Sequence, residues 1–173
     1  MEFMGQEMIA AREGIRYTVG IYNQSVDRPA YDNLAAVFTE DGEMIISGVT
    51  SFKGRQTIID SLSAGAKKRG VGQPGNFQRH TLGNSMINVI DSKTARAVHF
   101  AQVMTELGFD HAGLYIDDFV KVGDRWLIQT RRANMEWARP ESRFNAFPSH
   151  KHISTSEELD IGFLNSERLR GFL

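Results

Sequence analysis

Apolar residues recur with helical spacing in the N-terminal part of the chain. Within residues 7–26, Ile15, Val19 and Tyr22 follow one another at intervals of four and three, which is the spacing of one face of an α-helix. The sequence Asp-Arg-Pro at 27–29 follows, and the residue before a proline avoids helical backbone angles. The pattern therefore predicts an amphipathic helix that ends at this proline-containing segment.

Shorter elements follow, up to a glycine-rich loop. The pattern favours a short helix over residues 34–38, two short strands at 43–48 and 50–53, and a third helix from 54 to 70. The third helix ends in three consecutive cations and a glycine, which is typical of a helix C-terminus because cations interact favourably with the helix dipole there. Residues 70–76 have the composition of a loop.

The second half of the chain alternates between strand-like segments and turns. Four such segments, at 80–90, 94–107, 111–122 and 125–137, are separated by short connections that carry turn residues. The last three can pair as an antiparallel meander. Helices first and a sheet later indicate an α+β fold, and 173 residues suffice for one domain with a buried core.

One face of the segment at 94–107 has the small side chains of a cavity lining. Alternation along a strand groups five residues on that face, namely Ala97, His99, Ala101, Val103 and Thr105. We interpret His99 as a cavity residue, with a buried structural histidine as the alternative. On the following segment, Tyr115 shares a face with Gly113 and Asp117.

Three side chains can supply acid–base chemistry. They are Tyr22 and Asp27 at the end of the first helix and His80 at the start of a strand. A carboxylate beside an imidazole makes a general base of useful strength, and a phenol can donate a proton or hold an oxyanion. This set can run an elimination on a small organic molecule without a metal or a nucleotide. Simpler interpretations stay open: Asp27 caps the second helix, His80 is a structural histidine, and Tyr22 is a core residue.

Composition and charge exclude several functional classes. The net charge of −1 offers no basic footprint for nucleic acid, and no apolar run reaches the ~20 residues of a membrane span. The absence of cysteine excludes disulfides, thiolate nucleophiles and cysteine-based metal sites. The first residues lack the apolar stretch of a signal peptide, so we expect a cytoplasmic protein.

No cofactor and no metal are expected. His150 and His152 have no carboxylate cluster near them in the sequence, which makes them a poor metal site. The glycines at 72–75 lack the Gly-Lys-Ser/Thr sequence of a phosphate-binding loop. The pair Arg131-Arg132 suits either an anionic substrate or a solvated strand end.

The order of several short phrases resembles the SnoaL-like branch of the NTF2-like superfamily. These are VFTEDGE, RHTLGN and GLYIDDFVKVGDRWLIQTRR, within a stretch from 8 to 137. The resemblance implies a cone-shaped α+β fold, in which a curved mixed or antiparallel sheet and the N-terminal helices enclose a deep pocket. It also implies a homo-oligomer, for which we favour a trimer over a dimer.

The resemblance also implies roles for individual residues. Asp27 and His80 fall where the dehydratases and the dehydrochlorinase of this family keep an Asp–His dyad, and Tyr22 matches the tyrosine of the bile-acid dehydratase. Three further residues fall at or near pocket positions of family members, namely Thr105, Tyr115 and Asn134. The family's second pocket histidine corresponds to the place of Thr105, and His99 lies six residues earlier; with His99 taken from the strand alternation, these four residues are expected to bind substrate. The implied function is a cofactor-independent lyase, dehydratase-like, that acts on a small hydrophobic cyclic or aromatic substrate.

Two other functions stay open. The same dyad could serve a carbon–carbon lyase of the retro-aldol type, an isomerase or a cyclase. A non-catalytic protein, such as a dioxygenase β-subunit or a small-molecule binding protein, is the most different alternative. Residues 1–139 are expected to form the SnoaL-like domain. The apolar extension at 140–173, with a possible helix at 157–172, is expected to pack on this domain or on a neighbouring subunit.

Overall fold

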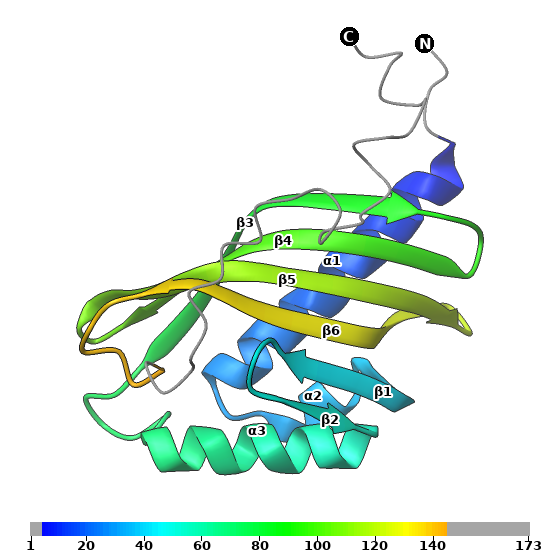
Figure 1. Ribbon diagram of the computed structural model, residues 1–173. Coiled ribbons are helices and arrows are strands. Elements are labelled where there is room, and N and C mark those ends of the chain that lie inside the picture. Colours follow the sequence, from blue (N-terminus) through cyan, green and yellow to red (C-terminus); the bar gives the residue numbers. More distant parts are fainter. Residues whose placement is uncertain (1–4, 145–173) are drawn as a thin grey trace, which may run out of the picture.

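Three helices and six strands make up the residues that the computed structural model describes, 5–144 (Figure 1). The helices are α1 (Gln6–Asp27), α2 (Tyr31–Ala35) and α3 (Arg55–Arg69). The strands are β1 (Phe38–Ile46), β2 (Thr50–Lys53), β3 (Gln78–Val89), β4 (Thr94–Thr105), β5 (Gly108–Val122) and β6 (Arg125–Ala138). The helical first half and the stranded second half agree with the pattern of the sequence.

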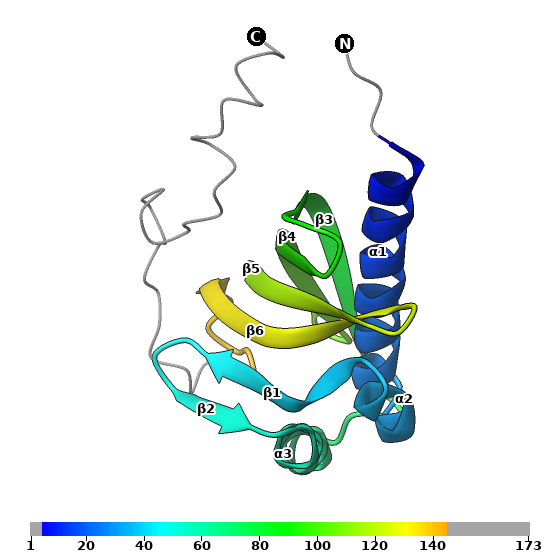
Figure 2. The ribbon, with the colours of Figure 1, turned by 90° about the vertical axis from the view of Figure 1, so that its right-hand side faces the viewer.

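The six strands form one curved sheet in the order β2-β1-β6-β5-β4-β3. Neighbouring strands are antiparallel except β1 and β6, which run parallel, so the sheet is mixed. Figure 2 shows its curvature, with α1 along one side and α3 beside β1 and β2. Helix α1 packs against β3 and β6, and α3 packs against β1 and β2. The predicted α+β cone and the antiparallel meander are therefore confirmed.

The core lies between the apolar face of α1 and the concave face of the sheet. Ile15, Val19 and Tyr22 are buried there, as their helical spacing predicts. Burying an aliphatic or aromatic side chain of this size contributes on the order of 1.5–3 kcal/mol. Gly14 lets α1 approach the sheet closely, because a Cβ at this position would lie 3.0 Å from Cδ1 of Trp126.

The short second helix ends earlier than the sequence indicated. Helix α2 stops at Ala35, and residues 37–38 already belong to the approach and start of β1. The backbone N–H of Ile128 donates to the carbonyl oxygen of Val37 (2.8 Å), and Phe38 pairs with Ile128 in parallel register. Because they pair with β6, Val37 and Phe38 do not continue helix α2. The register of β1 then shifts before Glu43, which hides the strand from a simple alternation pattern.

The predicted faces of β4 are confirmed by burial. Residues 97, 99, 101, 103 and 105 are all buried, whereas Phe100, Gln102 and Met104 on the other face are exposed; Val98, also on the other face, is buried against Leu114. The inner face therefore belongs to the core, and the outer face of the sheet presents apolar side chains to solvent.

We expect this outer face to bury itself in a homo-oligomer. Phe100, Met104, Phe109 and Trp137 are all between 44% and 53% exposed, and the last two rings stack with centroids 5.1 Å apart. Contiguous apolar side chains of this kind mark association surfaces. Light scattering on the full chain should give a multimer, with a trimer favoured, and Phe100→Glu should shift it towards the monomer.

Tyr17→Glu is the matched control for this experiment, because Tyr17 is an exposed aromatic residue on α1 and not on the sheet. It should leave the multimer intact. A monomeric wild-type protein would contradict the expectation.

No helix within residues 5–144 is long and apolar enough to cross a membrane. The expected helix at 157–172, most of the extension at 140–173, and both His150 and His152 lie outside the described residues.

Candidate active site

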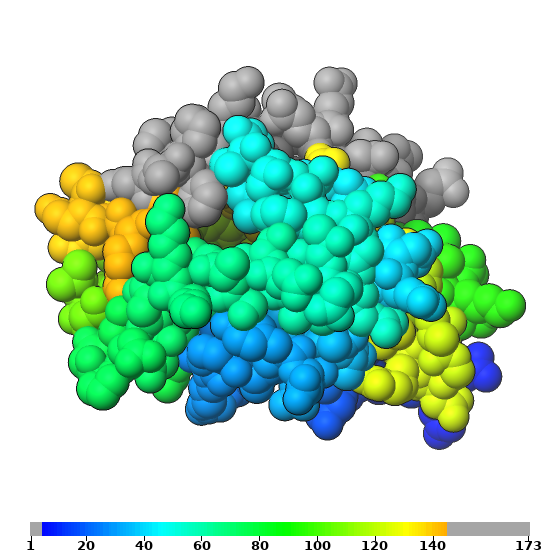
Figure 3. All heavy atoms as spheres, turned by 90° about the horizontal axis from the view of Figure 1, so that it is seen from below, coloured from blue at the N-terminus to red at the C-terminus, as the bar shows by residue number. Residues whose placement is uncertain are grey.

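A cavity opens between α1, α3 and the concave face of the sheet. Its walls are mostly apolar, and residues of α3 such as Leu62 and Ala66 line one side of it. Figure 3 shows the molecule hollowed beside α3. The polar residues of the lining are in the minority, and they come from distant parts of the sequence: Tyr22, Tyr31, Ser47, Arg69, Gln78, His80, His111, Tyr115 and Asn134. A mostly apolar cavity with a few convergent polar groups is the usual form of a small-molecule site.

The end of α1 and the start of β3 bring Asp27 and His80 together. Gln78 ties the two elements by donating its side-chain N–H to the carbonyl oxygen of Val26 (3.0 Å). One Asp27 oxygen accepts the backbone N–H of His80 (2.9 Å), and the other lies 2.6 Å from Nδ1 of the imidazole. A carboxylate oxygen accepts hydrogen bonds, so in the neutral imidazole this contact places the proton on Nδ1 and leaves the lone pair on Nε2.

The arrangement excludes a helix cap as the role of Asp27. Helix α2 begins after Ala30, three residues beyond Asp27, and both carboxylate oxygens of Asp27 are engaged by His80. Asp27 is buried behind the imidazole, while His80 lines the cavity. The carboxylate can therefore orient the ring and stabilise its protonated form without touching a bound molecule.

Tyr22 presents a phenol to the same space. Among the described residues, its hydroxyl group donates to Sδ of Met44 (3.8 Å), and a thioether is a weak acceptor. Burial raises the pKa of Tyr22 above its usual value of 10.0, although the nearby Arg131 guanidinium opposes the rise. Tyr22 thus stays a neutral phenol at physiological pH and can donate a strong hydrogen bond.

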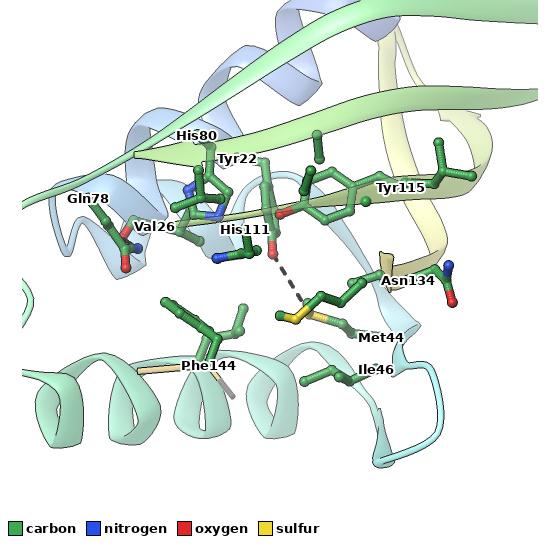
Figure 4. A pocket seen from close by; sticks show the side chains of 18 of the residues that line it. Tyr22, Val26, Met44, Ile46, Gln78, His80, His111, Tyr115, Asn134 and Phe144 are labelled. Carbon is green, nitrogen blue, oxygen red and sulfur yellow. Dashed lines mark hydrogen bonds between the residues drawn. The ribbon is translucent and has the colours of Figure 1, made fainter. Parts of the chain in front are cut away.

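Tyr115 lies between the other two groups. Its ring stacks with the His80 ring at a centroid distance of 6.4 Å and meets the Tyr22 ring edge-on at 6.2 Å. Figure 4 shows the hydroxyl groups of both tyrosines directed towards the space beside His80 and His111. Burial also raises the pKa of Tyr115, so this second phenol is a hydrogen-bond donor too.

Arg131 is neither a substrate ligand nor a solvated residue, the two roles that its sequence context allowed. It is fully buried, and its Nε and one terminal nitrogen donate to the two oxygens of Asp117 (2.8 and 2.6 Å). Its guanidinium carbon lies 4.0 Å from the Tyr22 ring centroid and 4.5 Å from that of Tyr115. Burial would raise the pKa of Asp117, but Arg131 outweighs it and holds that pKa below the usual value.

His99 belongs to this buried charge cluster rather than to the cavity lining. Its Nδ1 lies 2.8 Å from the Ser85 hydroxyl, and its Nε2 lies 3.4 Å from an oxygen of Asp117. The face predicted for His99 is right, and His99 lies directly opposite Tyr115 on the neighbouring strand, but its ring contacts Ser85 and Asp117 and does not line the cavity. The alternative of a buried structural histidine describes this position.

Thr105 and Asn134 do not present side chains to the cavity either. The Thr105 hydroxyl accepts the backbone N–H of Leu107 (3.3 Å) at the turn into β5, and Thr105 is not among the lining residues. Asn134 lines the cavity, but it pairs with Leu114, whereas Tyr115 pairs with Ala133. Its side chain therefore points to the opposite face, and Figure 4 shows the amide directed away from His80.

A second carboxylate–imidazole pair, which the sequence interpretation missed, also borders the cavity. Nδ1 of His111 lies 2.8 Å from an oxygen of Asp110, and the Ser142 hydroxyl donates to the same oxygen (2.6 Å). His111 lines the cavity, and its ring packs against Phe144. The signal was present, because His111 shares the period-two face of Gly113 and Tyr115 at the start of a predicted strand.

Acidification is expected to destabilise the fold through His111. Burial lowers the pKa of His111 below its usual 6.5, against the opposing effect of the hydrogen bond that His111 makes to the Asp110 carboxylate. The unfolded chain therefore binds a proton that the folded chain resists, so the free energy of unfolding falls as the pH drops from 6.5 towards the folded-state pKa. Denaturant unfolding between about pH 7.5 and pH 5 should show a steeper loss for the wild type than for His111→Gln. Parallel curves would rule out this contribution.

Within residues 5–144, no group of three or more His, Asp or Glu side chains is placed to hold a metal ion. The side chains described above offer acid–base chemistry: two imidazoles backed by carboxylates, and the phenols of Tyr22 and Tyr115, around one apolar space. Such a site can remove a proton from carbon and support negative charge on oxygen.

Comparison with solved structures supports the fold at low sequence identity. A candidate scytalone dehydratase from Novosphingobium aromaticivorans is 20% identical, with a TM-score of 0.67 over 79% of this chain and 91% of its own. Hexachlorocyclohexane dehydrochlorinase LinA-type3 from Novosphingobium barchaimii is 15% identical, with a TM-score of 0.67 over 80% and 94%. ActVI-ORFA from Streptomyces coelicolor is 22% identical, with a TM-score of 0.63 over 73% and 98%.

No protein of curated function matches the chain significantly. The family model of the SnoaL-like domain, in contrast, matches residues 7–132, which span α1 to most of β6. This match covers the helix end, the strand start and most of the cavity lining described above, and it confirms the resemblance seen in the sequence. The chain belongs to the SnoaL-like domain family of the NTF2-like superfamily.

Proposed function

We propose that this protein is a cofactor-independent lyase that eliminates water, or a comparable leaving group, from a small hydrophobic cyclic or aromatic molecule. The observation that carries the proposal is the 2.6 Å contact between Asp27 and Nδ1 of His80 at the wall of an apolar cavity. A base of this kind is costly to keep buried and has a clear use in proton abstraction. The dehydratase and dehydrochlorinase among the structural neighbours are consistent with it.

In the proposed reaction, Nε2 of His80 takes a proton from carbon. The electron pair of the broken C–H bond forms a carbon–carbon double bond as the adjacent carbon–oxygen bond breaks. The Tyr22 hydroxyl donates its proton to the departing hydroxide, which leaves as water, and the proton on His80 then restores the phenol. Asp27 stabilises the imidazolium ion between these steps. Positioned acid–base groups of this type typically contribute 10²–10⁴-fold in rate.

A second candidate function uses the same cavity for cleavage or isomerisation. The observation that favours it is the His111–Asp110 pair, which gives the cavity a second imidazole backed by a carboxylate. His111 could accept the proton of a β-hydroxyl group in a retro-aldol cleavage, or return a proton to another carbon in an isomerisation. Both reactions balance without an added cofactor.

A screen of hydroxylated aromatic, alicyclic and steroid-like compounds, followed by mass spectrometry, separates these functions. Loss of water supports the lyase, loss of formaldehyde or another small aldehyde supports carbon–carbon cleavage, and deuterium uptake from D₂O at constant composition supports isomerisation. Turnover should survive dialysis against EDTA and need no nucleotide. Activity that disappears on chelation and returns with one metal would overturn the proposed mechanism.

A non-catalytic binding protein remains the contrasting outcome of the same screen. A compound that binds tightly in the cavity, with no product and no exchange of its carbon-bound protons, would support it. The lyase proposal would then fail, because a dyad that moves no proton has no catalytic role.

A further inference from the structure

Arg69 differs from the other cations at the end of α3. The helix finishes with Lys67, Lys68 and Arg69, and Gly70 then turns the chain with a φ of 71°. Both lysines are exposed, whereas Arg69 is partly buried and lines the cavity. Helix α3 therefore delivers one cation to the same space that holds His80.

No carboxylate within residues 5–144 is paired with the Arg69 side chain. Its guanidinium lies 4.5 Å from the ring centroid of Phe144, and its Nε is buried without a hydrogen-bond partner. Arg143 lies next to it and donates to the Arg69 carbonyl oxygen (2.9 Å). The Glu106 carboxylate accepts from Arg143 (2.5 Å), so the acid beside Arg143 neutralises that arginine and not Arg69.

Arg69 and Arg131 differ in whether a carboxylate balances the charge of the guanidinium group. Arg131 is the other arginine close to the cavity tyrosines. It too has one buried nitrogen without a hydrogen-bond partner, but two hydrogen bonds to the Asp117 carboxylate balance its charge. Burial and then the charge of Arg143 lower the pKa of Arg69 from its usual 12.5, which is the behaviour of a cation that lacks a counter-charge. A buried donor left unsatisfied costs free energy that a bound anion would recover.

We propose that Arg69 binds a carboxylate group of the substrate, which makes the substrate class cyclic or aromatic carboxylic acids. The inference rests on the proposed function for the reaction at His80, but it concerns binding alone. A guanidinium group presents parallel donors that match the two oxygens of a planar carboxylate. Phe144 would cover one face of this guanidinium, and the apolar walls would hold the ring of the acid.

The negative end of the α3 dipole works against an anion at this place. Lys67 and Lys68 follow one another in the same last turn, and their charges offset that end of the dipole. The electrostatic potential at the end of α3 is therefore dominated by cationic side chains. Of these three cations, Arg69 lines the cavity.

The test uses matched neutral and anionic probes. Benzoate, cinnamate and naphthoate are each compared with the corresponding amide by isothermal titration calorimetry, on the full-length protein. At least one acid should bind the wild type about tenfold or more tightly than its amide, as expected for a charge-assisted bidentate pair. Arg69→Gln should remove that preference, because the acid should bind more weakly while the affinity for the amide stays unchanged. Arg69→Lys should keep part of the preference.

Lys68→Gln is the matched control, because it removes one charge from the same helical turn on an exposed side chain. It should keep the preference for the acid. Thermal unfolding of each variant checks that the fold is retained, and Arg69→Lys keeps the test valid if Arg69→Gln unfolds. Equal binding of acids and amides, no binding of any acid, or a preference that survives in Arg69→Gln would each overturn the inference.

The binding assay needs no turnover, so its failure is distinct from a failure of the proposed function. A protein without lyase activity that still selects acids through Arg69 would overturn the function and retain this subsite. A lyase that turns over neutral compounds, with no preference for acids, would retain the proposed function and overturn the proposed role of Arg69.

Discussion

His80→Ala and Asp27→Asn are each expected to lower kcat by two or more orders of magnitude on the substrate that the screen identifies. His80 would supply the base, and Asp27 holds its tautomer and orientation through two hydrogen bonds. Because the two side chains are proposed to act as one unit, the double variant should lose little more than His80→Ala alone. Single-turnover and steady-state kinetics on both single variants and the double variant measure this coupling.

Arg79→Gln is the neighbouring control for the dyad. Arg79 precedes His80 on β3, and its side chain is exposed on the other face of the strand. Its kcat should stay close to that of the wild type. A His80→Ala protein with near-wild-type kcat would remove the mechanism, and fully additive losses would show that Asp27 and His80 act separately.

Arg131→Met is expected to have the largest effect on stability. The substitution leaves Asp117 buried and without its bidentate partner, and breaking a buried pair in this way costs about 3–5 kcal/mol. Denaturant unfolding should show this loss in the free energy of unfolding. Replacing both partners, as in Arg131→Met with Asp117→Leu, should recover much of it, because no uncompensated charge then remains in the pair.

A second arginine–aspartate pair, which also uses an aspartate of β5, provides the control. Arg96 on β4 contacts Asp118 on β5 at 2.7 Å, and both side chains are partly exposed. Arg96→Met should therefore cost less than about 1 kcal/mol, as is usual for exposed ion pairs. An Arg131→Met protein that loses no more stability than Arg96→Met would show that the buried pair adds nothing to the fold.

The elements with a clear period could be predicted from sequence. Helix α1 follows from the spacing of Ile15, Val19 and Tyr22, and the two faces of β4 follow from alternation, with buried Val98 as the exception. The proximity of Asp27 and His80, in contrast, came from the family resemblance, because periodicity says nothing about which elements meet across 53 residues. The geometry of the pair was therefore predictable only as a family property.

Irregular strand pairing explains what could not be predicted. Counting outward from the two-residue turn after Val122 places Thr130 opposite Asp117. A register shift between Asp118 and Phe119 moves the pairing by one residue and brings Arg131 there instead. A second shift, between Ala112 and Gly113, lies further along the same strand pair. No pattern in the sequence marks these shifts. The ion-pair partner of Arg131 and the face of the sheet to which the Asn134 side chain points could therefore not be predicted.

The same carboxylate that orients the imidazole also joins a helix to a sheet. Asp27 is the last residue of α1, and it holds the main chain of β3 as well as the ring of His80. The base is therefore aimed by a junction between two elements rather than by the strand that carries it. A transfer of this site into another scaffold must therefore include the end of the helix and the start of the strand as one rigid unit. Grafting the side chains of Tyr22, Asp27 and His80 alone would leave the imidazole without a fixed direction.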